Sequence, residues 1–253
     1  MRIFILALLF VAAYSPSMPV LAAEAAAAAA DDDFSDFDDE FGEEAMQAAG
    51  TSKVFDPLRG YNRAMFHFND KFYFWFAKPL ARGYNFIVPK PARKSVNMAF
   101  HNLRFPIRFV GSLFQLKFKR VGVETGRFLV NSTIGIGGLF DPAKRWLKWE
   151  RPGDEDLGQV LAHYGVGDGF PIVLPFLGPS NLRDGLSIVP AIFLNPVIYV
   201  ADTPTSLAVT TGEQFNFISL HLGEYESMKK DALDPYTFMR DAYKQNREKR
   251  IRE

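Results

Sequence analysis

The chain contains no cysteine, which excludes disulfide bonds, cysteine-ligated metal sites and a lipid-modified N-terminal cysteine. It carries no net charge, because 29 basic residues balance 29 acidic ones. Alternating polar and apolar residues bounded by hairpin turns are scarce, whereas signals for the start of a helix recur along the chain. The sequence therefore favours an all-α class over a β-sandwich or barrel.

Sequence motifs for catalysis are also missing. The four histidines His67, His101, His163 and His221 are scattered without an HExxH pattern, and no Gly-x-Ser-x-Gly elbow is present. The glycines at 135, 137 and 138 lack the Gly-Lys-Ser/Thr ending of a P-loop. We expect no catalytic residue, no metal site and no cofactor. A phospholipase stays an alternative, because a catalytic triad can be assembled in space from distant residues.

The zero net charge hides a strong asymmetry between the ends of the chain. Residues 1–50 hold ten carboxylates and one base, so the rest of the chain has a net charge of +9. A basic body suits an anionic partner, either nucleic acid or an anionic lipid surface. The 25 phenylalanines, most of them in apolar company, favour lipid and argue against a nucleic-acid partner.

The chain divides into three parts. Residues 1–22 combine Arg2, an apolar run and small residues at a cleavage position, which is typical of a secretory signal peptide. Residues 23–53 are rich in alanine and acids, and such a segment is expected to be a disordered tether. An alternative for this segment is an acidic-aromatic docking motif. The folded domain is expected to cover residues 54–253.

Residues 169–201 form a nearly uncharged segment in which Arg183 and Asp184 are the only charges. A spanning helix needs about 20 apolar residues without breaks, but this segment is broken by five prolines. They are Pro171, Pro175, Pro179, Pro190 and Pro196. A bent apolar backbone survives in lipid only beside protein or a water-filled cavity, so the segment indicates a protein lodged in a bilayer around an internal passage. The alternative is the proline-rich core of a soluble domain.

Helices are predicted to start at four places, where Asp56, Asp141, Thr203 and Asp234 each precede a proline. Residues 58–78 carry aromatic side chains on every side of a helix, as at a membrane interface. Residues 91–104 read as an amphipathic helix with Arg93 on its polar face. Further helices are expected at about 105–120, 121–132 and 158–164. In the last helix, which begins at 235, Tyr236, Met239 and Tyr243 are expected to pack on the body.

Five segments together resemble the MlaA/VacJ family of outer-membrane phospholipid-transport proteins. They are DPLRGYNRAMFHFND (56–70), VPKPAR (88–93), NSTIGIGGLFD (131–141), LAHYGVGDGFPIVLPFLGPSNLRD (161–184) and DPYTFMRDAYKQNR (234–247). The resemblance implies a ring-like bundle of helices embedded in the membrane, with an internal amphipathic channel. It also implies a role in lipid asymmetry, in which misplaced phospholipid leaves the outer leaflet and no bond is made or broken.

The same resemblance implies partners and a location. The partners are phospholipid, the outer membrane, a soluble periplasmic lipid carrier and a trimeric porin. The location is the inner-leaflet side of the outer membrane, after export by the signal peptide. Family members are commonly lipoproteins, whereas this chain has no cysteine for a lipid anchor, so we expect attachment through the apolar body. A passive periplasmic lipid-binding scaffold is a further alternative.

Two sets of residues are candidates for function. The lipid path is expected at the glycine-rich turn and the bent segment, where backbone can approach or curve around an acyl chain. It comprises Gly135, Gly137, Gly138, Pro171, Pro175, Pro179, Arg183 and Asp184. Arg183 and Asp184 are expected to pair with each other or with another helix, because an isolated buried charge is costly; phosphate contact is the alternative. Docking of the carrier is expected at a basic, solvated C-terminal tail with Lys244, Arg247, Lys249, Arg250 and Arg252.

Overall fold

The structure is built almost entirely of helices, which confirms the predicted all-α class. The computed structural model describes residues 54–200 and 202–253. In chain order the elements are α4 (Arg59–Phe72), η1 (Tyr73–Ala77), α5 (Lys78–Ile87), α6 (Lys90–Leu103), α7 (Phe105–Phe114), α8 (Phe118–Thr133), α9 (Pro142–Leu147), α10 (Leu157–His163), β1 (Pro171–Leu174), β2 (Gly178–Asn181), α11 (Leu182–Ile192), α12 (Val197–Val200), α13 (Thr203–Leu220), α14 (Glu224–Asp231) and α15 (Pro235–Arg252).

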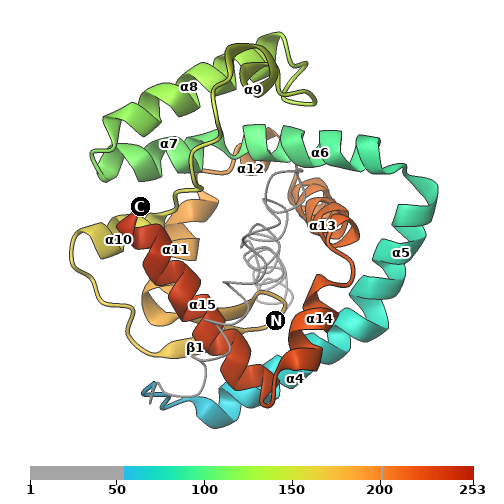
Figure 1. Cartoon of the computed structure of the whole chain (residues 1–253), viewed down its shortest axis with the longest axis vertical. Helices are drawn as coiled ribbons and strands as arrows, with labels where there is room; N and C mark the ends of the chain where they lie inside the picture. The colour runs from blue at the N-terminus through green and yellow to red at the C-terminus, as the bar shows by residue number, and fades with distance from the viewer. Residues whose placement is uncertain (1–53, 201) are drawn as a thin grey trace.

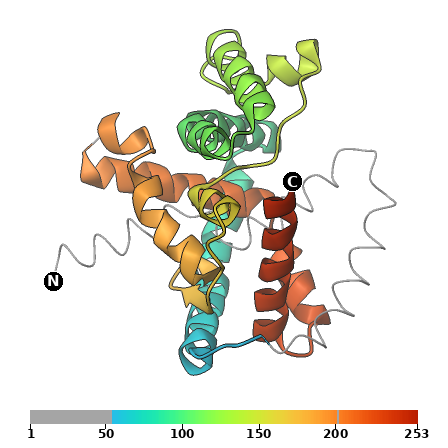
Figure 2. The same cartoon turned by 90° about the vertical axis from the view of Figure 1, so that its left-hand side faces the viewer.

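The helices follow one another around a common centre, so the body of the protein has the shape of a ring (Figure 1). α13 packs against α5 and α6, and α15 returns to lie beside β2 and α10. We call α7, α8 and α9 the outer lobe, because α8 and α9 lie on the outer side of α6 and of α7, which continues from α6 (Figure 1). Figure 2 shows the lobe projecting from the ring, with α15 on one face of the ring and α11 and α12 on the other.

α4, η1 and α5 form one continuous helix, which extends beyond the predicted residues 58–78. Pro79 lies inside it, has no N–H to donate and crowds the carbonyl one turn earlier. The π-turn η1 absorbs this defect, because the backbone N–H of Lys78 reaches back five residues to the carbonyl of Tyr73. The helix ends at Val88, whose extended backbone is the conformation favoured before proline.

Most of the buried hydrophobic side chains gather where α4, η1, β1, α14 and α15 meet. This aromatic core consists of Phe66, Tyr73, Ala77, Val173, Tyr225, Tyr236, Met239 and Tyr243. The Tyr73 and Tyr225 rings meet edge to face with 4.8 Å between centroids, a geometry that aromatic quadrupoles favour. The predicted packing of the first turns of α15 through Tyr236, Met239 and Tyr243 is confirmed.

The outer lobe has the opposite arrangement of side chains to the aromatic core. Most of its buried side chains are polar, namely Arg108, Ser112, Glu124, Arg127 and Asn131, and α9 adds the apolar Pro142 and Ala143. Its apolar side chains are largely exposed, among them Leu113, Phe114, Leu116, Phe118, Leu129 and Ile134. Over the part of the chain that the structure describes, buried polar or charged residues outnumber buried hydrophobic ones. So large an exposed apolar surface marks a site of contact with lipid or with another protein.

Three expectations about the helices are wrong. Asp56 does not cap α4, which starts three residues later; its carboxylate instead accepts hydrogen bonds from Asn62 and from the Tyr236 hydroxyl. Arg93 is buried rather than solvated, and its guanidinium donates to the carbonyl of Ser219 on α13 at 2.6 Å. The helix predicted over 105–120 breaks at residues 115–117, where Leu116 adopts a φ of 58°.

Candidate functional site

The bent apolar segment begins as a two-stranded hairpin. β1 and β2 pair antiparallel, with Val173 opposite Pro179. Pro171 starts the first strand and Pro175 lies in the turn; Phe176 in the turn and Gly178 at the start of β2 have positive φ. The three prolines of the candidate lipid path therefore lie together in one hairpin, and this short sheet is an exception to the helical pattern.

Two asparagines fasten the hairpin to α4. The side-chain amide of Asn62 donates to the carbonyl of Pro171 at 2.9 Å and accepts from the N–H of Val173 at 2.8 Å. Asn69 does the same with Leu174 and Phe176, at 2.9 and 2.7 Å. Residues seven apart lie on one face of a helix, so this pair of amides substitutes for a third strand. Asn62 is fully buried, as a side chain with all its hydrogen bonds satisfied allows.

A buried ionic cluster follows the hairpin directly. Asn181 caps α11 by accepting from the N–H of Asp184 at 2.7 Å. The Asp184 carboxylate also accepts from Arg183 at 2.9 Å and from the Tyr243 hydroxyl at 2.6 Å. Arg247 of α15 donates to Asp184 at 3.0 Å. The prediction that Arg183 and Asp184 pair with each other is confirmed, and the pair also ties α11 to α15.

Asp156 completes this cluster. It caps α10 by accepting from the N–H of Gln159 at 2.9 Å, and Arg247 donates to both of its oxygens. Burial raises the pKa of the Asp156 carboxyl, but the charge and hydrogen bonds of Arg247 outweigh burial and hold the pKa well below its usual range. A Cβ on Gly158 would lie 2.4 Å from both Arg247 and Asp184. Only glycine at this position leaves room for the cluster that closes the ring at α10, α11 and α15.

The glycine-rich turn lies elsewhere, between α8 and α9, and packs on α6. A Cβ on Gly138, which has a φ of 91°, would lie 2.4 Å from the Cβ of Asn102. Asn102 donates to the Ser132 hydroxyl at 2.9 Å and thereby holds α6 against the end of α8. Gly137 has a φ of 68°, but a Cβ there would meet nothing within 4 Å. A Cβ on Gly135 would lie 2.5 Å from the carbonyl oxygen of Phe140. Gly135 and Gly138 are therefore needed for packing, whereas Gly137 faces open space.

The predicted path residues thus occupy two separate places in the structure. The hairpin prolines, Arg183 and Asp184 lie together beside α4 and α15, while the glycine-rich turn belongs to the outer lobe and α6 (Figure 1). The sequence analysis did not identify the residues that hold the hairpin and the Arg183–Asp184 pair in position. These residues are Asn62, Asn69, Asp156 and Arg247. The seven-residue spacing of the two asparagines was the one signal available for them.

The C-terminal bases differ from the prediction of a solvated tail. Arg247 is buried in the ionic cluster, and Arg250 donates to the carbonyl of Asp154 at 2.6 Å. Both belong to the body of the protein, so the prediction is wrong for them. Lys244 and Arg252 are solvated and share Glu248 as their ion-pair partner, and Lys249 is exposed as well. These three bases remain candidates for carrier docking.

The chemical inventory of the described residues is sparse. No group of three or more potential ligands comes together in residues 54–200 and 202–253 to hold a metal ion. His101 is partly buried beside Asp154, Arg108 and Arg151; desolvation and the two arginines lower its pKa to about 3, so the imidazole stays neutral. None of the helices in the described part of the chain is long and apolar enough to cross a bilayer.

The comparisons with known proteins agree with this architecture. A family model described as MlaA lipoprotein matches residues 54–250. The chain belongs to the MlaA family. Its relatives include an uncharacterized protein of Rickettsia bellii, 36% identical over 201 residues that cover 79% of this chain and 78% of that protein. The intermembrane phospholipid transport system lipoprotein MlaA of Shigella flexneri is 32% identical over 191 residues, 74% of this chain and 75% of the relative.

One solved structure shares the ring of this MlaA-family chain. It is described as the structural basis for maintenance of bacterial outer membrane lipid asymmetry. It superposes with a TM-score of 0.69 at 29% identity, and the match covers 79% of this chain and 100% of that chain. The arrangement of α4 to α15 is therefore the fold of the family.

Proposed function

We propose that this protein is the outer-membrane component of a phospholipid-transport system, which removes misplaced phospholipids from the outer leaflet and passes them to a soluble periplasmic carrier. The observation that carries the proposal is the inverted distribution of side chains. A ring with apolar residues outside and buried polar residues within suits a body set in lipid around a path for polar headgroups. Family membership supports the same role, because relatives are named as parts of an intermembrane phospholipid transport system.

The transport role asks for binding and release, with no bond made or broken. The apolar exterior would hold the ring in the bilayer, and α5 contributes two strongly exposed side chains to it, since Phe86 is 93% exposed and Ile87 77%. The lipid would pass the hairpin on one side and the glycine-rich turn on the other, so that its headgroup meets polar side chains. The bases Lys244, Lys249 and Arg252 would attract an acidic surface on the carrier. A trimeric porin beside the ring would present a further apolar neighbour.

The test is carried out in a Gram-negative strain that lacks its own family member. Expression of this chain should lower the amount of phospholipid in the outer leaflet, measured with an amine-reactive reagent that does not cross the membrane. Total lipid is analysed in the same cells for lysophospholipid and free fatty acid. Removal without hydrolysis products supports transport. Hydrolysis products at the level of removed lipid would show a phospholipase instead, and an unchanged outer leaflet would refute both.

A matched pair of substitutions tests the glycine-rich turn as part of the path. Gly137 and Gly165 both have positive φ, 68° and 83°, and open space where a Cβ would be. Asparagine adopts this backbone conformation more readily than other side chains, so Gly137→Asn and Gly165→Asn add bulk with a small and similar strain at the two positions. We expect Gly137→Asn to impair lipid removal at an unchanged protein level, while Gly165→Asn leaves both unchanged. Equal effects of the two substitutions would remove Gly137 from the path.

A further inference from the structure

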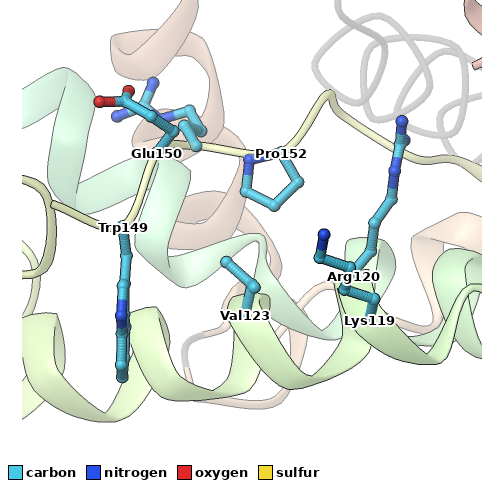
Figure 3. A pocket seen from close by; sticks show the side chains of 7 residues that line it. Lys119, Arg120, Val123, Trp149, Glu150 and Pro152 are labelled. Carbon is cyan, nitrogen blue, oxygen red and sulfur yellow. The ribbon is translucent and has the colours of Figure 1, made fainter.

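The outer lobe carries a pocket that the proposed lipid path does not use. It has a volume of about 380 Å³ and lies between α8 and the loop after α9, as Figure 3 shows. Its lining residues are Lys119, Arg120, Val123, Trp149, Glu150, Arg151 and Pro152. This volume is in the range of sites for small ligands.

The wall of the pocket is held in place by buried contacts. A Cβ on Gly126 would lie 2.6 Å from the Trp149 ring, so the indole rests directly on the backbone of α8. Arg127 donates to the carbonyl of Trp149 and, at 2.6 Å, to Asp141. Asp141 in turn caps α9 by accepting from the N–H of Lys144 at 3.0 Å. The indole is thereby fixed before any ligand arrives, which lowers the entropy lost on binding.

The charge on the pocket is mainly positive. Lys119 is exposed and, among the described residues, makes none of the ion pairs that fix its neighbours Lys117 and Arg120 to Glu155. The guanidinium of Arg151 is 40% exposed and lies 4.0 Å from Asp141. Glu150 is the one carboxylate of the lining, and Lys144 lies 3.7 Å from it. Arg120 and Arg151 thus have carboxylate partners, whereas the ammonium of Lys119 has none among the described residues and is left to bind an anionic ligand.

Exposed aromatic side chains that neighbour lining residues in the sequence indicate the source of that anion. Phe118, which precedes Lys119, is 64% exposed, and Trp146, three residues before Trp149, is 64% exposed as well. Rings at such positions suit the interface of a bilayer, where basic side chains also meet lipid phosphates. A free phosphate ion would gain nothing from them.

We propose that this pocket binds the phosphate headgroup of an anionic phospholipid, with the acyl chains running over Phe118 and Trp146. Lys119 and Arg151 contact the phosphate, and the Trp149 indole lies against the glycerol. The site is on the outer side of the ring and does not depend on the proposed transport role. It fixes the depth and the tilt of the outer lobe in the membrane, whatever passes through the ring.

The experiment uses the full-length chain in a neutral maltoside detergent, with Trp149 as the fluorescent reporter. The chain has three tryptophans, and Trp75→Phe and Trp146→Phe remove the other two; phenylalanine at 146 keeps an apolar ring for the acyl chains, and every variant is compared in this same background. The probes are dihexanoyl phosphatidylglycerol, dihexanoyl phosphatidylcholine and inorganic phosphate. Lys119→Glu is compared with Lys230→Glu, a charge reversal at an exposed lysine on α14, far from the lobe (Figure 1).

We expect phosphatidylglycerol to shift the emission of Trp149 at lower concentrations than either other probe. Lys119→Glu should raise its half-saturating concentration roughly five- to thirtyfold, the effect of removing or reversing one charge at a lipid surface. Lys230→Glu should leave it within about twofold, and circular dichroism should show equal helix content in both variants. These measurements report binding to the pocket alone. Binding can therefore be observed even if the chain does not remove lipid in cells, and lipid removal can be observed even if the pocket binds no lipid.

Three results would overturn the proposal. If phosphatidylglycerol and phosphatidylcholine half-saturate the pocket at the same concentration, the pocket has no preference for an anionic headgroup. Half-saturation by inorganic phosphate at the same concentration as by phosphatidylglycerol would make the pocket a site for free anions. Equal effects of Lys119→Glu and Lys230→Glu would place the lipid outside the pocket. Should Lys119→Glu lose helix content, Lys119→Gln repeats the comparison without a new charge.

Discussion

The aromatic core and the outer lobe bury opposite kinds of side chain, hydrophobic in the core and polar in the lobe. The core packs Phe66, Tyr73 and Tyr236 against one another, as a soluble protein would. The lobe buries Arg108 and Glu124 and leaves its apolar side chains outside. The core can therefore fold by excluding water, whereas the lobe gains that stabilisation only if lipid or detergent covers its outer surface.

The polar interior of the lobe is held by charge pairs rather than by hydrophobic burial. Arg108 donates to the Glu124 carboxylate at 3.1 Å and to the carbonyl of His101 at 2.7 Å. Buried pairs of this kind add little net stability, because desolvation offsets their attraction, but losing one partner is strongly destabilising. The lobe is therefore specific in its packing and fragile to single substitutions.

The first prediction concerns the buried ion pair of Arg108 and Glu124 inside the lobe. Arg108→Met should lower the free energy of unfolding by about 3–5 kcal/mol, because it leaves the Glu124 carboxylate buried without its partner. The double variant Arg108→Met/Glu124→Leu should recover most of that loss, since no lone charge remains. Thermal unfolding in detergent, followed by circular dichroism, measures both. A double variant as unstable as the single one would show that the pair, and not the lone charge, decides stability.

The second prediction sets one phenylalanine of each region against the other. Phe66→Ala in the aromatic core should lower the free energy of unfolding by about 3–4 kcal/mol, the usual effect of a cavity. Phe118→Ala in the lobe, where the ring is 64% exposed, should change it by less than about 0.5 kcal/mol in detergent. It should instead weaken binding to lipid vesicles, measured by flotation. Equal losses of stability would contradict the contrast between the regions.

The sequence predicted the positions of the helices better than it predicted which face of each helix is buried. The spacing of apolar residues predicted an amphipathic helix over 91–104, and α6 is there. Its polar face was expected to meet water, yet Arg93 lies inside against α13. Hydrophobic periodicity gives the division of a helix into two faces, but the surrounding medium decides which face is buried. That medium cannot be read from periodicity.

Other features depended on partners distant in sequence. Asp56 precedes a proline as a cap would, but it bonds with Tyr236, 180 residues away. The cluster around Asp184 draws on Asp156 and Arg247, whose pairing no local pattern predicts. The break at Leu116 has a positive φ without glycine or proline to announce it. The pairing of Arg183 with Asp184 was predictable, because two lone charges stand together in an apolar segment.

The third prediction concerns pH, to which the two regions should respond with opposite sign. Burial, Arg108 and Arg151 lower the pKa of His101, beside the lobe, to about 3. Its ordinary value is 6.5, so the unfolded chain takes up this proton first and stability is lost as the pH falls below 6.5. Burial raises the pKa of Glu224, on α14, from 4.5 to about 7. Its contribution is therefore complete below pH 4.5 and is lost as the pH rises through 7.

Two amide substitutions measure these contributions. His101→Gln should remove up to about 2 kcal/mol of the stability lost between pH 7 and pH 5. Glu224→Gln should flatten the decline between about pH 4.5 and pH 7 and leave the slope above that range unchanged. Melting temperatures of the three proteins are recorded across pH 5–8. Parallel curves for the wild type and His101→Gln would mean that this imidazole is solvated in the native state.

The last and smallest effect is expected at the end of α15, which leaves the aromatic core through Tyr243 and ends in solvated bases. Truncation of the helix after Gln245 would confuse two roles, because it also removes Arg247 from the ionic cluster. Lys244→Glu/Arg252→Glu changes only solvated positions. Steering by surface charge acts mainly on the association rate and weakens with salt. The double variant should therefore bind the purified periplasmic carrier several times more slowly at low salt, with an unchanged melting temperature. If both proteins associate equally fast at low ionic strength, α15 ends in these bases for solubility alone, and the carrier docks elsewhere.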